Sequence, residues 1–101
     1  MPGVTRDGDA TTTGHGCDAT TTVTGPSTDV FCNNLGVERK TDPAAAHTIP
    51  NSADPPVCVA HSATITEGSS TVFVNSKAIA RKGDSCDSGE ITEGSPTVFA
   101  G

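Results

Sequence analysis

Residues 65–74 read ITEGSSTVFV and residues 91–100 read ITEGSPTVFA, so the chain repeats nearly the same ten residues. A looser copy, VTGPSTDVF, occupies residues 23–31. When Ser27 is aligned with Ser69, six further positions match without a gap: Val30 with Val72, Phe31 with Phe73, Asn33 with Asn75, Arg39 with Arg81, Lys40 with Lys82 and Asp42 with Asp84. Three copies of one unit predict a repeat protein, in which each unit buries its apolar face against its neighbours.

The repeated unit has the pattern of a β-hairpin. Residues 27–42 and 69–84 each contain a Val-Phe segment, a polar turn and a second short apolar segment, which is the order of strand, turn and strand. The Thr-rich stretch from Thr11 to Val23 also favours extended structure, broken near Gly14. Prolines limit any helix to a turn or two, so we predict an all-β fold of short hairpins. Residues 42–56 hold four of the seven prolines and are expected to form the longest loop.

The composition indicates a single domain, residues 1–101, with repeats at about 8–42, 43–84 and 85–101. Only 33% of the residues are hydrophobic, with three Phe and neither Trp nor Tyr. Ordering a chain costs about 1.5 kcal/mol per residue, which so few apolar side chains offset only in part. We therefore expect a metal ion, disulfides or oligomerisation to support the fold.

The net charge of −6 argues against a nucleic-acid partner, because no cluster of Lys and Arg is present to neutralise phosphates. No apolar run is long enough for a membrane span or a secretory signal. The sequence thus favours synthesis in the cytoplasm, where thiols stay reduced. In that setting a set of Cys and His residues indicates metal binding more than disulfides.

Candidate metal ligands recur at equivalent places in the repeats. His15 lies six residues after Asp9, His47 five after Asp42, and Cys86 two after Asp84, while His61 comes just before the second signature. A pseudo-threefold fold would gather these segments at one end. Zinc in structural sites takes four imidazole or thiolate ligands in tetrahedral geometry. We therefore predict a structural Zn²⁺ bound by His15, His47, His61 and Cys86.

The other cysteines leave several interpretations open. Cys32 takes the place of Val74 and is predicted to be a buried apolar residue. Cys58 is predicted to pack as well, although its spacing from His61 would also suit chelation. Cys17 is a rival zinc ligand because it lies two residues after His15, and a disulfide among Cys17, Cys32 and Cys58 is a further alternative.

No catalytic motif accompanies these residues. The acidic side chains of Glu67, Glu90 and Glu93 belong to repeats or turns and are expected to be solvated surface. The chain has no supported Ser-His-Asp pattern and no phosphate-binding glycine loop. We predict that the protein is not an enzyme, whereas a zinc site with one open position would indicate a hydrolase.

Taken together, these features resemble the PAAR-repeat proteins that tip the spikes of contractile injection machines. The resemblance is carried by Gly8-Asp9 with His15-Gly16, by two copies of Ser-x-x-Val-x-x-Asn closing on Arg-x-x-Asp, and by a final Gly-Ser-Pro-Thr-Val. The tetrapeptide that names the family is degenerate here, as GVER at 36–39 and AIAR at 78–81, and keeps only the Arg. The resemblance implies a small cone with a flat base and a zinc ion near its sharp end, held by three His and one Cys.

The resemblance also implies a function. The expected role is a non-enzymatic tip that caps a trimeric β-helical spike of a phage tail or type VI secretion system, one monomer on a trimer. Such a tip would help puncture the target envelope and touch its membrane transiently. The alternative is a disulfide-stapled extracellular binding or adhesion module.

Overall fold

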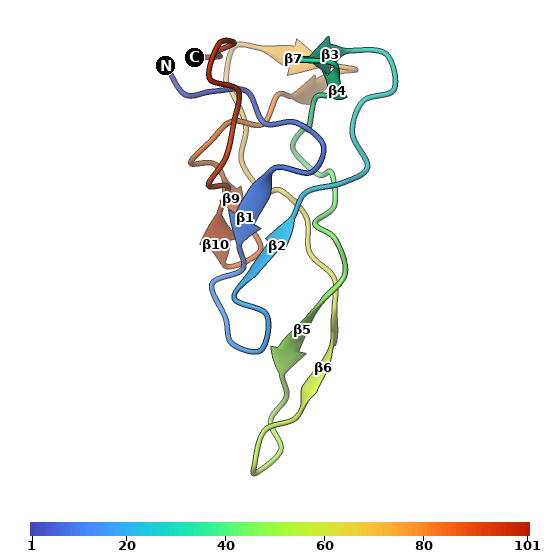
Figure 1. Ribbon diagram of the computed structural model, residues 1–101, viewed down its shortest axis with the longest axis vertical. Helices are drawn as coiled ribbons and strands as arrows, with labels where there is room; N and C mark the ends of the chain where they lie inside the picture. The colour runs from blue at the N-terminus through green and yellow to red at the C-terminus, as the bar shows by residue number, and fades with distance from the viewer.

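The protein is a narrow cone in a computed structural model that describes residues 1–101, with extents of 45 × 24 × 21 Å. Both termini lie at the wide end, and a single hairpin forms the narrow end (Figure 1). Every regular element is a β-strand, so the predicted all-β class is confirmed. The structure contains no helix that could span a membrane.

Ten short strands pair as five antiparallel hairpins, β1–β2, β3–β4, β5–β6, β7–β8 and β9–β10. The strands are β1 (Ala10–Thr12), β2 (Thr20–Thr22), β3 (Phe31–Cys32), β4 (Leu35–Gly36), β5 (His47–Pro50), β6 (Cys58–His61), β7 (Phe73–Val74), β8 (Lys77–Ala78), β9 (Ser85–Cys86) and β10 (Gly89–Glu90). The β3–β4 and β7–β8 hairpins lie at the wide end, whereas the others point towards the apex (Figure 1).

The two basal hairpins confirm the turns predicted from the repeat. Asn33 and Asn34 have φ values of 53° and 66°, and Asn75 and Ser76 have 52° and 65°. Consecutive left-handed residues form the tight turn that matches the twist of paired strands. Asn suits these positions because its short polar side chain tolerates the left-handed region.

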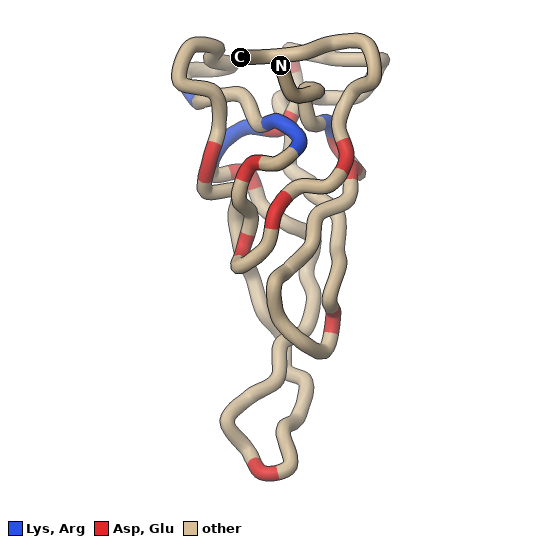
Figure 2. The backbone as a smooth tube through the Cα atoms, turned by 90° about the vertical axis from the view of Figure 1, so that its left-hand side faces the viewer, with Lys and Arg blue, Asp and Glu red and all other residues tan.

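The third basal unit is assembled from both ends of the chain. Gly3 bridges Phe99, in the way that Gly36 pairs with Phe31 and Ala78 with Phe73. The N-terminal segment therefore supplies the half of the repeat that is missing after Phe99. The chain ends lie together at the wide end, where the other units have their turns (Figure 2).

Equivalent residues of the three units form the core, which consists of two apolar clusters. The basal cluster contains Val4, Val37 and Ile79 with Cys32, Val74 and Ala100. The second cluster contains Val23, Ile65 and Ile91 with Ala44, Ala80 and Cys86. The predicted burial of Cys32 is confirmed. Because each cluster draws on all three units, no unit could bury its apolar face alone.

An Arg–Asp pair closes each unit beneath the base. The pairs are Arg6–Asp9, Arg39–Asp42 and Arg81–Asp84, with shortest charged contacts of 3.0, 2.8 and 2.9 Å. In every pair the Asp also accepts the backbone N–H of its own Arg. These half-buried, bidentate pairs fix the loop that turns the chain towards the apex.

Three hairpins of unequal length follow the three Asp residues. The longest is β5–β6, so the loop that we expected over residues 42–56 is interrupted by strand β5, whereas residues 51–57 do form the loop of this hairpin. His47 pairs with His61, and Pro50 with Cys58, in a continuous register. Pro50 is accommodated because both strands of a two-stranded hairpin are edge strands, where a missing N–H can face solvent.

Candidate metal centre

The three post-Asp hairpins bring four side chains together on the axis of the cone. His15 comes from the loop between β1 and β2, and Asp87 from the turn between β9 and β10. His47 and His61 face each other across the first register pair of β5 and β6. We call these four residues the apical cluster. Their ligand atoms all lie within 4.8 Å of one another.

The imidazoles surround the Asp87 carboxylate symmetrically. The ring centroids of the three His residues are 5.1 to 5.2 Å apart in every pair. His15 Nε2 and His47 Nε2 each lie 2.8 Å from Asp87 Oδ2, and His61 Nε2 lies 3.2 Å from Asp87 Oδ1. The three Nε2 atoms and the Asp87 carboxylate thus lie close together, and each of the four side chains comes from a loop, a turn or a strand end.

Backbone carbonyls determine which ring nitrogen faces the centre. His15 Nδ1 lies 2.9 Å from the Gly16 carbonyl oxygen, and His47 Nδ1 lies 2.8 Å from that of Ala45. A carbonyl only accepts, so each Nδ1 carries the hydrogen and each neutral ring directs the Nε2 lone pair towards Asp87. Outer hydrogen bonds of this kind orient metal-binding imidazoles.

The centre therefore contains lone pairs that need a cation between them. Two Nε2 lone pairs and a carboxylate oxygen cannot satisfy one another without added protons or a metal ion. Imidazole nitrogen and carboxylate oxygen both bind zinc, and these four ligand atoms lie within 4.8 Å of one another. The apical cluster could thus hold a metal ion.

The ionisation of the cluster fits this interpretation. Burial raises the pKa of Asp87, but the hydrogen bonds that His47, His15 and His61 donate when their Nε2 atoms are protonated outweigh that effect and bring the pKa down to about 2. The pKa of His15 is raised, first by its hydrogen bond to the Gly16 carbonyl and then by Asp87, although burial opposes the change. Asp87 is consequently a carboxylate at neutral pH and available as a ligand.

The structure differs from our prediction at the fourth ligand, because Cys86 lies outside the apical cluster. Its side chain is fully buried beside Ile65 and Ile91 in the second apolar cluster. Neighbouring residues at a strand end point in different directions, so Cys86 faces the core while Asp87, at a φ of 56°, faces the axis. Burial raises the pKa of the Cys86 thiol, which opposes formation of a thiolate ligand.

Comparison of the repeats contains the signal that sequence reasoning missed. Cys86 follows Asp84 by two residues, as Thr11 follows Asp9 and Ala44 follows Asp42. Thr11 and Ala44 are small, and both are buried in the structure. The position is therefore a core position in all three units, and the next residue that could bind a metal is Asp87.

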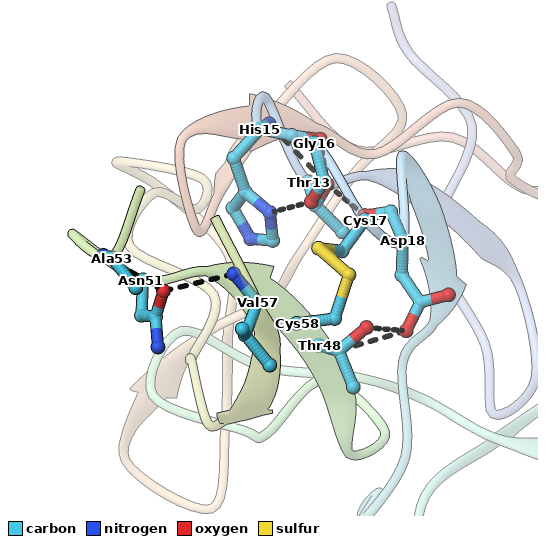
Figure 3. The surroundings of a disulfide bond; sticks show 10 residues. All are labelled: Thr13, His15, Gly16, Cys17, Asp18, Thr48, Asn51, Ala53, Val57 and Cys58. Carbon is cyan, nitrogen blue, oxygen red and sulfur yellow. Dashed lines mark hydrogen bonds between the residues drawn. A yellow bond between two sulfur atoms is a disulfide. The ribbon is translucent and has the colours of Figure 1, made fainter. Parts of the chain in front are cut away.

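For Cys17 and Cys58 the structure shows the alternative that we left open, a disulfide among Cys17, Cys32 and Cys58. Cys17 and Cys58 form a disulfide with a Cα–Cα distance of 5.8 Å (Figure 3). Cys17 is therefore no rival ligand, and Cys58 is exposed instead of packed in the core. We expected the cysteines to be reduced and to favour a metal site instead of a disulfide. For Cys17 and Cys58 this was wrong, because the chain has a disulfide as well as a candidate metal centre. Sequence spacing could not reveal the pairing, since it depends on which loops meet at the apex.

Comparison with known families agrees with this architecture. The PAAR motif matches residues 8–89 and again residues 58–101. The chain belongs to the PAAR family. Membership confirms the resemblance and implies a spike-tip protein of the type VI secretion or phage-tail type. A search of curated proteins found no match to this PAAR protein.

Proposed function

We propose that this PAAR protein is the non-enzymatic tip that caps a trimeric β-helical spike of a phage tail or type VI secretion system and helps puncture the target envelope. The observation that carries the proposal is the pseudo-threefold arrangement of one chain, with matching apolar side chains exposed at its wide end. A single polypeptide built in this way can present three similar surfaces to three identical chains.

The wide end has the chemistry of a docking surface. Phe31, Phe73 and Phe99 occupy equivalent positions and are 61%, 60% and 49% exposed. The Val that precedes each Phe is exposed as well. Solvent-facing aromatic groups of this density usually mark a protein interface. The short β3–β4 and β7–β8 hairpins add strand edges that a spike could extend by β-augmentation.

The narrow end supports the puncturing role. Residues 46–63 contribute to neither apolar cluster, so the apex depends on cross-links. We propose Zn²⁺ as the ion of the apical cluster, where a structural zinc contributes about 10–16 kcal/mol in small domains. All six Lys and Arg residues lie outside residues 46–63, and the tube of Figure 2 has blue only towards its wide end. The apex would meet the target membrane transiently.

This role implies a sequence of locations. The chain would be made in the cytoplasm, bind the spike there and travel at its tip.

Mixing the full chain with the isolated end of a candidate trimeric β-helical spike tests the docking role. We expect a complex of one chain with three spike chains, measured by mass spectrometry under native conditions. Zinc content is measured separately on the same preparation. Failure to bind any β-helical spike end offered would overturn the capping role.

The Cys17–Cys58 disulfide favours a second candidate, a stapled extracellular binding or adhesion module, because disulfides persist in oxidising surroundings. That role predicts no trimeric partner and no need for zinc. A folded chain that lacks metal and binds no spike would support it.

A further inference from the structure

The β5–β6 hairpin extends beyond the part of the molecule that apolar packing holds. In this hairpin only His47 is buried, and it belongs to the apical cluster. A two-stranded hairpin is marginally stable by itself in water. Its position on the body must therefore come from specific cross-links.

Two of these cross-links join the same pair of segments at different heights. The loop between β1 and β2 supplies His15 and Cys17, and β6 supplies His61 and Cys58. The two imidazoles meet at Asp87, nearer the core. The two sulfurs meet three residues further towards the apex along β6.

A third link joins the same loop to β5. The Asp18 carboxylate accepts hydrogen bonds from Thr48 N at 2.7 Å and Thr48 Oγ1 at 2.8 Å (Figure 3). The loop is thus attached to both strands of the hairpin, by hydrogen bonds on one side and by the disulfide on the other. A movement of this loop away from the hairpin would carry His15 out of the centre.

The disulfide and the two free thiols of the chain differ in accessibility. Cys17 and Cys58 are exposed, whereas the free thiols of Cys32 and Cys86 are buried. Oxidants and reductants in solution therefore reach the disulfide and not the core thiols.

We propose that the Cys17–Cys58 pair is a redox-operated lock on the apical cluster: the disulfide slows loss of the metal ion, and the bound ion favours the disulfide. The proposal rests on the metal-binding part of the proposed function. With the pair reduced, the loop can open and release His15. With the pair oxidised, the loop is held to β6 and the ion stays enclosed.

The oxidation step is an ordinary thiol–disulfide exchange. Cys17 and Cys58 give up two protons and two electrons to the disulfide of an oxidoreductase or of oxidised glutathione, which is reduced to two thiols. A bound ion fixes His15 and His61 and so holds the two thiols near each other, which raises their effective concentration. By linkage, the factor by which the ion favours the disulfide equals the factor by which the disulfide raises ion affinity. A tip made under reducing conditions would load its ion while open and lock on reaching oxidising surroundings.

The first test measures zinc release from the full chain. Zinc-loaded protein, oxidised or treated with a phosphine reductant, is mixed with excess chromogenic chelator. We expect release from the oxidised protein to be slower by about tenfold or more, within the usual range of coupling. The matched control is the double variant Cys17→Ser with Cys58→Ser, whose release rate should equal that of the reduced protein and be unaffected by reductant. Equal rates for the oxidised and reduced protein would overturn the lock.

The reciprocal test equilibrates the chain in glutathione redox buffers with and without zinc. Zinc should shift the midpoint of oxidation towards more reducing buffers, and should leave the midpoint of His61→Ala unchanged. An unshifted midpoint in the unmodified chain overturns the coupling. A chain that retains no zinc at all overturns both the lock and the metal site, but leaves the spike-binding experiment as a separate test of the capping role.

Discussion

The amide of Ala80 donates a hydrogen bond to the carbonyl of Glu38 at 2.9 Å. The same bond runs from Glu38 to Thr5 at 2.9 Å and from Thr5 to Ala80 at 3.0 Å, so three equivalent residues close a ring. All three are fully buried. At this buried position Ala80 and Thr5 place no charged group, whereas Glu38 places a carboxyl group.

That carboxyl group is expected to weaken the fold as pH rises. Neither side-chain oxygen of Glu38 has a hydrogen-bond partner. Burial, followed by the nearby charges of Asp42 and Asp7, raises its pKa to about 9, and Arg39 only partly opposes this. Between its ordinary pKa and this raised value, the folded protein keeps a proton that the unfolded chain releases, so increasing pH favours unfolding.

Glu38→Thr should therefore stabilise the protein, and by more at higher pH. The gain should grow by about 1.4 kcal/mol per pH unit between about pH 5 and 9. Urea unfolding of both proteins at pH 5, 7 and 9 measures it, with exposed Glu90→Thr as the control. A gain that does not change with pH would mean that Glu38 is ionised in the folded state.

The sequence predicted those parts of the molecule that repeat. Matching Asn33 with Asn75 located both basal turns, and the spacing of His15, His47 and His61 from the repeat brought the three imidazoles together. Where the units differ from one another, the repeat pattern predicted nothing. Cys86 and Asp87 are adjacent in sequence but face the core and the axis, and the repeat marks Cys86 as a core position only when it is aligned with Thr11 and Ala44. Likewise the β5–β6 hairpin is longer than its counterparts in the other units, and the Cys17–Cys58 pairing joins it to the β1–β2 loop, so neither has an equivalent in another repeat to compare.

The fourth ligand gives a second prediction. Asp87→Ala should reduce zinc affinity by at least about 100-fold, since loss of an outer-shell partner alone costs 10–100-fold. Cys86→Ala should keep the ion and lose only some packing in the core. Competition with a chelator of known affinity measures both variants. The cobalt-substituted protein should lack the charge-transfer absorption of a thiolate ligand, and finding that absorption would return the role to Cys86.

The Arg–Asp pairs give a third prediction, because they are not quite equivalent. Arg39 Nη1 also donates to Asn75 Oδ1 of the neighbouring unit at 3.0 Å, as Arg6 Nη1 does to Asn33 at 3.1 Å. Gly101 occupies the equivalent position of the third copy and has no side chain to accept such a bond. Arg39→Ala should therefore destabilise the protein by about 1 kcal/mol more than Arg81→Ala.

Urea unfolding of these two variants measures the difference. Repeating both substitutions in an Asn75→Ala background isolates the bond between units, and the difference should then disappear. If Arg39→Ala and Arg81→Ala lower the free energy of unfolding equally in the unmodified chain, the contact with Asn75 contributes nothing to stability.

The exposed Phe residues give the last prediction, which concerns the spike. Phe31, Phe73 and Phe99 are equivalent in the repeat and similarly exposed, so a trimer with three identical surfaces should bind them alike. Each single change to Ser should weaken binding by a similar factor, about fivefold or more if each ring contributes over about 1 kcal/mol. The three variants should keep their zinc and their unfolding midpoint, since these rings lie outside the core. Titration calorimetry against the same spike end compares them, with Lys77→Ser as the control on the same face. Loss of binding from only one of the three substitutions would indicate a one-sided contact and contradict docking on the threefold axis.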